Sequence, residues 1–131
     1  MPLTADRNTP ERDGKEGARA PAAGQVIYRG ALIALNASGE VVKGAVATTL
    51  KVLGRAKNST EDAAYDGLIR WQRGCFRWKN SAAADAITAA DIGSTAYIVD
   101  DETVAKTNGT STRSAAGTIR DVDAQGVWVE S

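Results

Sequence analysis

Residues 25–43, QVIYRGALIALNASGEVVK, contain three short runs of residues that favour β-strands, at 26–29, 32–35 and 41–43. The last two runs flank Asn36, Ser38 and Gly39, which are residue types that form tight turns. Similar runs recur along the chain, at 46–53, 68–72, 75–78, 96–99, 103–105, 117–122 and 127–130. Short strands at this spacing predict an all-β fold, a small β-barrel or β-sandwich whose body spans residues 25–131.

One part of this body does not have the β-prone pattern. Residues 81–92, SAAADAITAADI, are rich in alanine and are followed by Gly93. Alanine favours helix, and glycine commonly ends one. We therefore expect one short helical segment at about 82–92.

The first 24 residues have a different composition. They carry four basic and four acidic side chains, and Met1 and Leu3 are their only large apolar residues. Such a segment cannot bury enough apolar surface to offset an ordering entropy of about 1–2 kcal/mol per residue. We predict an N-terminal arm at 1–24 that is extended or disordered alone and orders along a partner. Its candidate contact residues are Leu3, Arg7, Arg12, Lys15 and Arg19.

Two of the predicted strands, 31–35 (ALIAL) and 96–99 (AYIV), are apolar on both faces. A strand in a small barrel has one buried face, so its residues should alternate between apolar and polar. The second apolar face needs a cover, which the arm, a loop or another subunit can supply. We therefore expect the chain to form an oligomer.

Several classes of site are excluded by composition. The chain has no histidine and a single cysteine, Cys75, so one chain cannot form an imidazole-based catalytic or metal site or an internal disulfide. The longest unbroken apolar stretch, 31–35, is far shorter than a membrane span or the core of a signal peptide. We expect a soluble, non-enzymatic protein with no catalytic residue, cofactor, metal site or membrane partner, in which Cys75 is a small buried residue.

Residues 70–79, RWQRGCFRWK, carry four positive charges, no negative charge and three aromatic rings. One interpretation is single-stranded nucleic-acid binding, in which cations contact phosphates and rings stack on bases. The other is structural: the rings lie in the core or at a subunit interface, and a β-bulge at Gly74 brings them to one face. We favour the structural interpretation and do not expect direct nucleic-acid binding. The candidate subunit interface consists of Trp71, Arg73, Phe76, Arg77 and Trp78.

Two acidic segments have residue types that can bind a cation. Residues 121–126, DVDAQG, match the opening of a calcium-binding loop, but the segment before them is β-like and not helical. Residues 100–102, DDE, could form a cation site or a carboxylate pair, although neighbouring residues on a strand point to opposite faces. We interpret the first segment as a hairpin turn and the second as a solvated turn.

The order of six segments resembles the capsid cement (head decoration) proteins of tailed bacteriophages. The similarity covers about residues 24–131, and its most specific part is DIGSTAYIVDDETV at 91–104, within the matching segment 87–104. The other segments are GQVIYRGALIALN at 24–36, GEVV at 39–42, RGCFRW at 73–78, AGTIRDVD at 116–123 and GVWV at 126–129.

This resemblance implies a β-barrel or β-sandwich that assembles as a homotrimer on the outside of the phage head, after synthesis in the cytoplasm of the bacterial host. The expected partners are the major capsid protein and further copies of the chain. The trimer is expected at or near three-fold positions, where it bridges capsid subunits and stabilises the shell against the pressure of packaged DNA. A small nucleic-acid-binding barrel that uses residues 70–79 remains the alternative.

Overall fold

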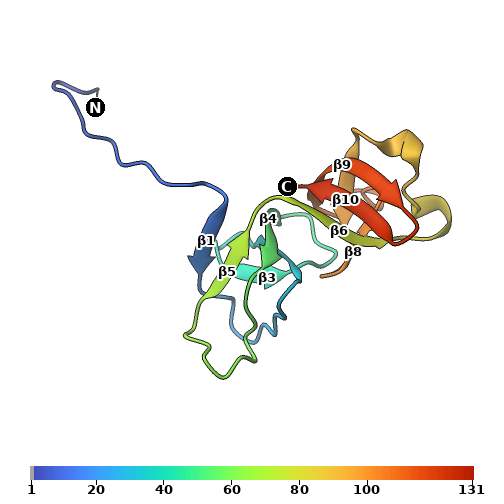
Figure 1. The fold of residues 1–131 in the computed structure, drawn as a ribbon, viewed down its shortest axis with the longest axis horizontal. Helices are drawn as coiled ribbons and strands as arrows, with labels where there is room; N and C mark the ends of the chain where they lie inside the picture. The colour runs from blue at the N-terminus through green and yellow to red at the C-terminus, as the bar shows by residue number, and fades with distance from the viewer. Residues whose placement is uncertain (1) are drawn as a thin grey trace.

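The computed structural model describes residues 2–131, which form ten strands and two 3-10 turns (Figure 1). The first five strands form one sheet in the order β1-β5-β4-β2-β3, and the last five form a closed barrel in the order β10-β6-β8-β7-β9. This confirms the predicted all-β class and the β-barrel. The sheet contains β1 (Glu16–Arg19), β2 (Leu32–Leu35), β3 (Val41–Lys43), β4 (Lys51–Ala56) and β5 (Ile69–Gln72), and the barrel contains β6 (Cys75–Asn80), β7 (Thr95–Ile98), β8 (Thr103–Ala105), β9 (Ala115–Asp123) and β10 (Gly126–Glu130).

We call residues 15–73 the sheet unit and residues 74–131 the barrel unit. The prediction of one barrel body at 25–131 did not anticipate this division. The chain passes from one unit to the other at Arg73 and Gly74, between β5 and β6. The expected β-bulge at Gly74 is wrong, because the two strands that flank it belong to different sheets.

The barrel core follows from the alternation of side chains along its strands. On β6 and β10, Trp78 lies opposite Val127 and Phe76 lies opposite Val129, so large apolar residues face the interior together. A parallel pairing of β6 with β8 and antiparallel pairings elsewhere close the barrel. Its buried cluster consists of Leu32, Trp78, Ile87, Ala96, Ile98, Val104, Ala116, Ile119, Val127 and Val129.

The sheet unit has a core of its own around Ile27, which is fully buried but does not lie in a strand. The strand predicted at 26–29 is therefore wrong. The Ile27 amide donates to the Thr60 hydroxyl at 3.1 Å, and the Ser59 hydroxyl donates to the Ile27 carbonyl at 3.0 Å. These side chains satisfy backbone groups that a neighbouring strand would otherwise pair. The cluster consists of Ile27, Ala31, Ile33, Val41, Leu53, Ala56 and Ile69.

Strand β2 lies between the two cores, which explains why it is apolar on both faces. Leu32 packs into the barrel cluster, whereas its neighbour Ile33 packs into the sheet cluster. Successive side chains of a strand point to opposite faces, so one strand contributes to both cores. The second face of β2 is thus covered within the chain, and this strand no longer supports the expectation of an oligomer.

The loop before β4 also fastens the two units together. The strand predicted at 46–53 begins only at Lys51, because residues 44–50 form this loop. The buried Ser114 of the barrel unit accepts a hydrogen bond from the Leu50 amide at 3.0 Å and donates one to the Ala47 carbonyl at 2.6 Å. Gly44 lies so close to the barrel that a Cβ there would be 2.6 Å from the Asp100 carbonyl oxygen.

The arm predicted at 1–24 is partly built into the sheet unit, which corrects its boundary. Strand β1 pairs with β5 from Glu16 to Arg19. Immediately after it, Ala20 and Ala22 hydrogen-bond with Val41 of β3 at the opposite edge of the sheet, at 3.3 Å and 2.9 Å. Residues 16–19 therefore form one edge of the sheet, and residues 20–22 pair with the other edge. Only residues 2–14, which we call the free arm, extend away from the body (Figure 1).

The helical segment predicted at 82–92 is present as two single 3-10 turns, η1 (Ala83–Asp85) and η2 (Ala89–Asp91). Thr88 and Asp91 form a capping box at the start of η2. Gly93 follows with a φ of 95°, a left-handed conformation that glycine adopts without steric cost. The segment is therefore helical where expected, but it forms no α-helix.

Candidate interaction surfaces

The free arm exposes every one of its residues from Pro2 to Gly14. Leu3 is 72% exposed, and Arg7 and Arg12 are exposed beside it in the chain. A segment of this length spans about 43 Å when fully extended, at about 3.3 Å per residue. An exposed leucine and two arginines on such a segment can contact a surface well beyond the body.

Lys15 and Arg19, the other two predicted contact residues of the arm, belong to the sheet unit. The Lys15 carbonyl accepts a hydrogen bond from the Arg73 amide at 2.6 Å, which extends the pairing of β1 with β5 by one residue. Both side chains are exposed and remain available to a partner.

Strand β1 approaches the sheet closely because residue 17 is glycine. A Cβ at Gly17 would lie 2.3 Å from a ring carbon of Trp71, so the indole ring occupies the space of a side chain. Glu16 forms an ion pair with Lys57 on the neighbouring part of the sheet unit. The glycine and the ion pair hold the base of the arm on the body.

The three rings of residues 70–79 face inward. Trp78 is 6% exposed and lies in the barrel core, so it cannot serve at a subunit interface. Phe76 is half-buried and packs edge-on against Trp78 with ring centres 6.3 Å apart, while Arg55 covers its other side at 4.4 Å. Trp71 is half-buried against the sheet cluster. Trp78 is therefore a core residue, as one form of the structural interpretation expected. Phe76 and Trp71 pack against the barrel and sheet clusters of the same chain.

The four cations of residues 70–79 already have partners within the chain. Arg70 pairs with Asp66 at 2.6 Å, which lowers the pKa of that carboxyl group. Lys79 pairs with Glu102 at 2.8 Å, and this hydrogen bond raises the pKa of the lysine.

The remaining two cations of this segment make weaker contacts. Half-buried Arg73 donates to the Val52 carbonyl at 3.3 Å. Exposed Arg77 lies 5.7 Å from the ring centre of Trp128 on the outer face of the barrel. Trp128 was not among the predicted site residues, although its position opposite Arg77 in the register brings the two together.

Residues 121–126 comprise the end of β9, the turn at residues 124–125 and the start of β10, in agreement with their interpretation as a hairpin. One carboxylate oxygen of Asp123 accepts the Gln125 and Gly126 amides at 2.8 Å and 3.0 Å, and the other accepts the Trp128 indole N–H at 3.0 Å. The indole hydrogen bond is the main cause of the lowered pKa of Asp123. These acceptors are occupied in holding the turn.

Residues 100–102 likewise form a turn, between β7 and β8. Asp100 accepts the Glu102 amide at 2.9 Å, and Glu102 pairs with Lys79. The Asp101 carbonyl accepts the Leu32 amide at 2.8 Å, so this turn also fastens β2 to the barrel unit. Over residues 2–131, no group of three or more histidine, cysteine, aspartate or glutamate side chains could hold a metal ion.

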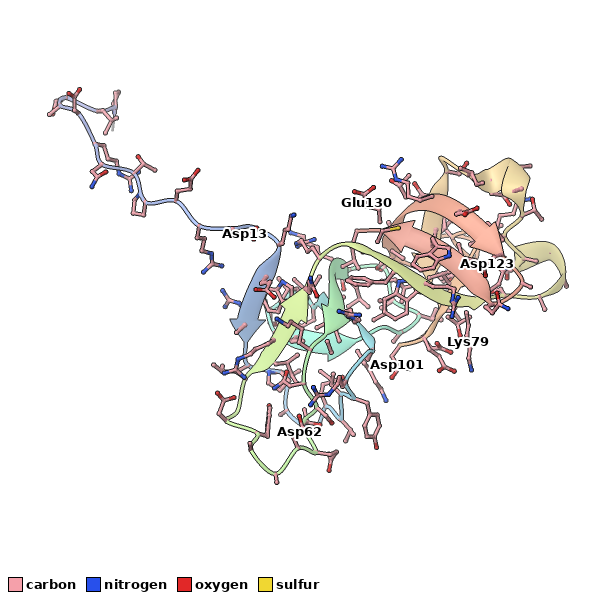
Figure 2. The ribbon with its side chains drawn as sticks, in the orientation of Figure 1. Asp13, Asp62, Lys79, Asp101, Asp123 and Glu130 are labelled. Carbon is pink, nitrogen blue, oxygen red and sulfur yellow. The ribbon has the colours of Figure 1, made fainter. Side chains whose placement is uncertain are left out.

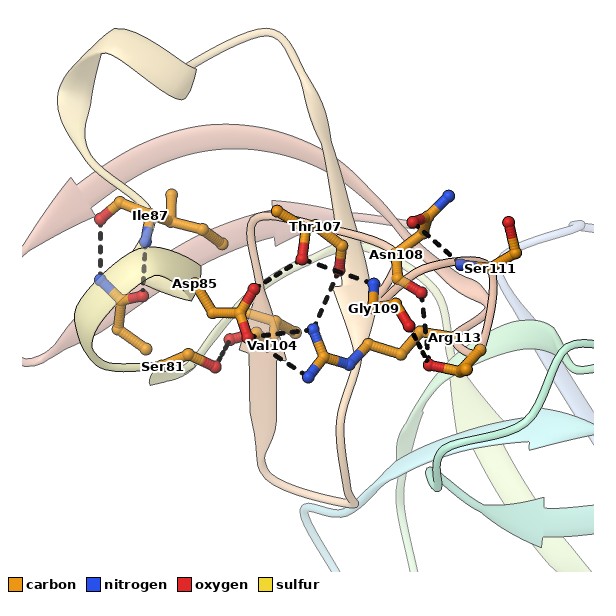
Figure 3. Close-up of polar contacts among 11 residues, drawn as sticks. Ser81, Asp85, Ile87, Val104, Thr107, Asn108, Gly109, Ser111 and Arg113 are labelled. Atoms are coloured by element: carbon orange, nitrogen blue, oxygen red, sulfur yellow. Dashed lines mark hydrogen bonds and ion pairs between the residues drawn. The ribbon is translucent and has the colours of Figure 1, made fainter.

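A polar network that the sequence did not indicate closes one side of the barrel (Figure 3). Asp85 accepts a hydrogen bond from the Thr107 hydroxyl at 2.6 Å and pairs with Arg113 at 3.3 Å. The Thr107 hydroxyl is the main cause of the lowered pKa of Asp85. Arg113 also donates to the Thr107 carbonyl at 3.1 Å, so one aspartate holds the 107–113 loop against turn η1.

Cys75 is exposed at the start of β6, so the expectation of a buried cysteine is wrong. Partial desolvation and the nearby Glu130 carboxylate raise the pKa of its thiol. A thiol with a raised pKa forms less of the reactive thiolate at neutral pH.

Several apolar side chains that the sequence analysis did not single out are exposed on the body. Tyr28 is 59% exposed and Val46 is 55% exposed. Ile92, Val26 and Leu68 follow, at 46%, 39% and 37%. Val26 and Tyr28 share the segment before β2, whereas Val46, Leu68 and Ile92 lie in three other loops, so the five do not by themselves define one interface.

Comparison of the chain with models of protein families, with curated proteins and with solved structures found no match in any of the three. None of the helical turns over residues 2–131 is long or apolar enough to cross a membrane.

Proposed function

We propose that this chain is a structural protein of a tailed-bacteriophage head, a capsid cement protein that binds the outer surface of the assembled shell. In this proposal three copies bridge neighbouring major capsid subunits and help the shell resist the pressure of packaged DNA. The role is mechanical and not enzymatic.

The observation that carries this proposal is the free arm. Residues 2–14 are exposed along their whole length, and they end just before β1, which joins the sheet unit. Ordering a segment costs conformational entropy. A segment that buries no surface within its own chain can offset this cost only through contacts with a partner. A neighbouring subunit on a shell supplies an extended surface of this kind at high local concentration.

The resemblance of residues 24–131 to cement proteins supports the same function. Its most specific part, 91–104, runs from turn η2 through β7 to β8. Asp91 of this part accepts the Thr88 amide, which is the main cause of the lowered pKa of its carboxyl group. Asp91, Asp100 and Glu102 of this stretch form hydrogen bonds or ion pairs with nearby groups of the same unit. These contacts hold the local structure, and a structural role in assembly requires no more of them.

The nucleic-acid alternative has less support from the arrangement of residues 70–79. Base stacking needs exposed rings, but Trp78 lies in the barrel core and Gly17 lies against Trp71. Arg70 and Lys79 are engaged by carboxylates. We therefore keep capsid binding as the proposed function.

Co-sedimentation with phage heads tests the proposal. Heads of the phage whose genome encodes the chain, stripped of this protein, should carry the wild-type chain into the pellet at saturable stoichiometry. A variant that lacks residues 2–13 should bind at least about tenfold more weakly, because it loses the arm contacts. Its melting temperature should equal that of the wild type, which shows that the body is intact.

Absence of wild-type binding to both expanded heads and proheads would contradict the proposal. An origin of the chain outside any phage or prophage genome would contradict it as well.

A further inference from the structure

The two units carry opposite net charges. The sheet unit, residues 15–73, contains nine basic and five acidic side chains, a net charge of +4. The barrel unit, residues 74–131, contains five basic and eight acidic side chains, a net charge of −3. Residues 1–14 carry the remaining −1, which gives the whole chain its net charge of zero. The neutral total therefore conceals a strong charge asymmetry.

Ion pairing within the chain does not cancel this asymmetry. All seven ion pairs of residues 2–131 join side chains of the same unit, and none connects the sheet unit to the barrel unit. Three pairs lie in the sheet unit and four in the barrel unit. Pairing of this kind removes equal numbers of both signs from each unit, so the excess charge of each unit remains.

The side chains left without an ion pair among residues 15–131 show where the excess lies. In the sheet unit they are mostly cations, and in the barrel unit they are mostly acids. The unpaired residues of the sheet unit are Lys15, Arg19, Lys43, Lys51, Arg55 and Arg73, with Glu40 and Glu61, and those of the barrel unit are Asp100, Asp101, Asp121 and Asp123, with Arg77.

The lining of the surface hollows places this excess charge more closely. On the sheet unit, Arg29, Arg55 and Lys57 line a concavity of about 290 Å³ together with Gly30 and Ala56. It lies at the junction of the units, because Arg29 and Gly30 also line an adjoining hollow that contains Asp101 and Glu102 of the barrel unit. On the barrel unit, Asp123 lies at the end of β9, on the side away from the sheet (Figure 2). The complementarity between the units is therefore one of net charge.

We propose that copies of this chain associate head to tail, with the cationic sheet unit of one copy against the acidic barrel unit of the next. The partner is a second copy of the chain because the charge excess of each unit matches the opposite excess of the other. The two contacting surfaces differ, so the interface is heterologous and forms a closed ring where the rotation between copies permits it. This inference rests on the proposed function, since it specifies how cement subunits join around a three-fold axis.

Electrostatic association of this kind depends on salt. The screening length is about 30 Å at 10 mM ionic strength and about 3 Å at 1 M. Charges at an interface contribute chiefly to association rate and partner choice, and like charges opposite one another oppose binding. Association of the free protein should therefore be strongest at low salt, and on a shell the high local concentration supports it at physiological salt.

Charge reversal tests the orientation. In one variant, Lys15, Lys43 and Lys51 are all changed to Glu, which brings the sheet unit from +4 to −2 because each change lowers the charge by two. In a second variant, Asp100→Lys and Asp121→Lys bring the barrel unit from −3 to +1. The three lysines are exposed, and the structure assigns their side chains no hydrogen bond or ion pair. A third variant carries all five changes, so its two units are again opposite in sign.

Sedimentation velocity of the full chain at about 10 mM and about 1 M salt provides the measurement. The wild type should associate at low salt and dissociate at high salt. Each variant with changes in only one unit should associate at least about tenfold more weakly than the wild type. The variant with all five changes should have an association constant within about threefold of the wild-type value. Melting temperatures of all variants show that they are folded.

A wild type that stays monomeric at low salt would overturn the inference, as would folded variants with changes in only one unit that associate as well as the wild type. Loss of association in the variant with all five changes would also overturn the inference, because restored charge complementarity should restore the contact. Head binding by a monomeric wild-type chain would retain the proposed function while this inference fails. Head-to-tail association without head binding would retain the inference while the capsid role fails.

Discussion

Gly17 has a structural role that its sequence context does not indicate, because the residues around it have the composition of an unstructured tail. The indole ring of Trp71 lies where a side chain of residue 17 would be. The ring in turn packs against the sheet cluster. A single glycine thus allows the base of the arm to lie on the body.

Gly17→Val should destabilise the protein by about 1–3 kcal/mol, because the new side chain collides with a packed ring. The fluorescence of Trp71 should shift to longer wavelength as the ring becomes more exposed to water. Gly14→Val is the matched control, since a Cβ at Gly14 meets no atom within 4 Å and should change stability by less than about 0.5 kcal/mol. Equal melting temperatures for the two variants would show that β1 does not pack as described.

Asp85 acts at the same scale in the barrel unit, where it holds the Thr107 hydroxyl and Arg113. Its pKa is lowered in the folded state, so its contribution to stability is present above its unfolded pKa of about 3.9 and is lost as the pH falls through the lower folded value. Asp85→Asn should therefore lower the melting temperature at pH 7 and have a progressively smaller effect below about pH 4. A difference from the wild type that is the same at pH 7 and pH 3 would contradict this role.

At the scale of elements, the sequence predicted most strands because their residues are β-branched or aromatic and turn residues separate them. Strand β1 was missed because EGAR at 16–19 has no such preference and is a strand only through its pairing with β5. The opposite error occurred at 26–29, where β-prone residues surround Ile27 but Ser59 and Thr60 hold the backbone instead. Both errors arise from contacts between residues far apart in the chain, which local propensity does not contain.

The corrected boundary of the arm leads to a prediction about truncation. Removal of residues 2–13 should leave the melting temperature unchanged, because the residues removed are exposed. Removal of residues 2–20 also deletes β1 and the Ala20 contact with Val41, and it should lower the melting temperature by at least about 5 °C. Thermal unfolding followed by circular dichroism distinguishes the two. Equal melting temperatures for both truncations would mean that β1 contributes nothing to the sheet.

At the scale of the whole molecule, two cores share one strand, and this arrangement changes the meaning of the apolar pattern at 31–35. The pattern correctly indicated that β2 needs a second cover, but the cover is the other unit of the same chain, through Leu32 and Ile33. The sequence could not distinguish an internal second core from a subunit interface, because both require the same residues. Of the candidate site residues, Leu3, Arg7 and Arg12 are exposed and stay a prediction, whereas Trp78 lies in the core.

Self-association is therefore best sought through charge, and capsid binding through the free arm. The opposite signs of the two units become apparent only once the boundary at Arg73 and Gly74 is known, since the total charge is zero and the four cations of residues 70–79 are divided between the units. The free arm extends from the sheet unit, away from the barrel unit (Figure 1).

Electron cryomicroscopy of stripped heads incubated with the wild-type chain is the decisive test of capsid binding by this protein. We expect density for three copies at three-fold or quasi-three-fold positions on the outer surface, with residues 2–14 resolved against the shell or a neighbouring copy. Heads without added density at saturating protein, or density confined to the inner surface, would contradict it.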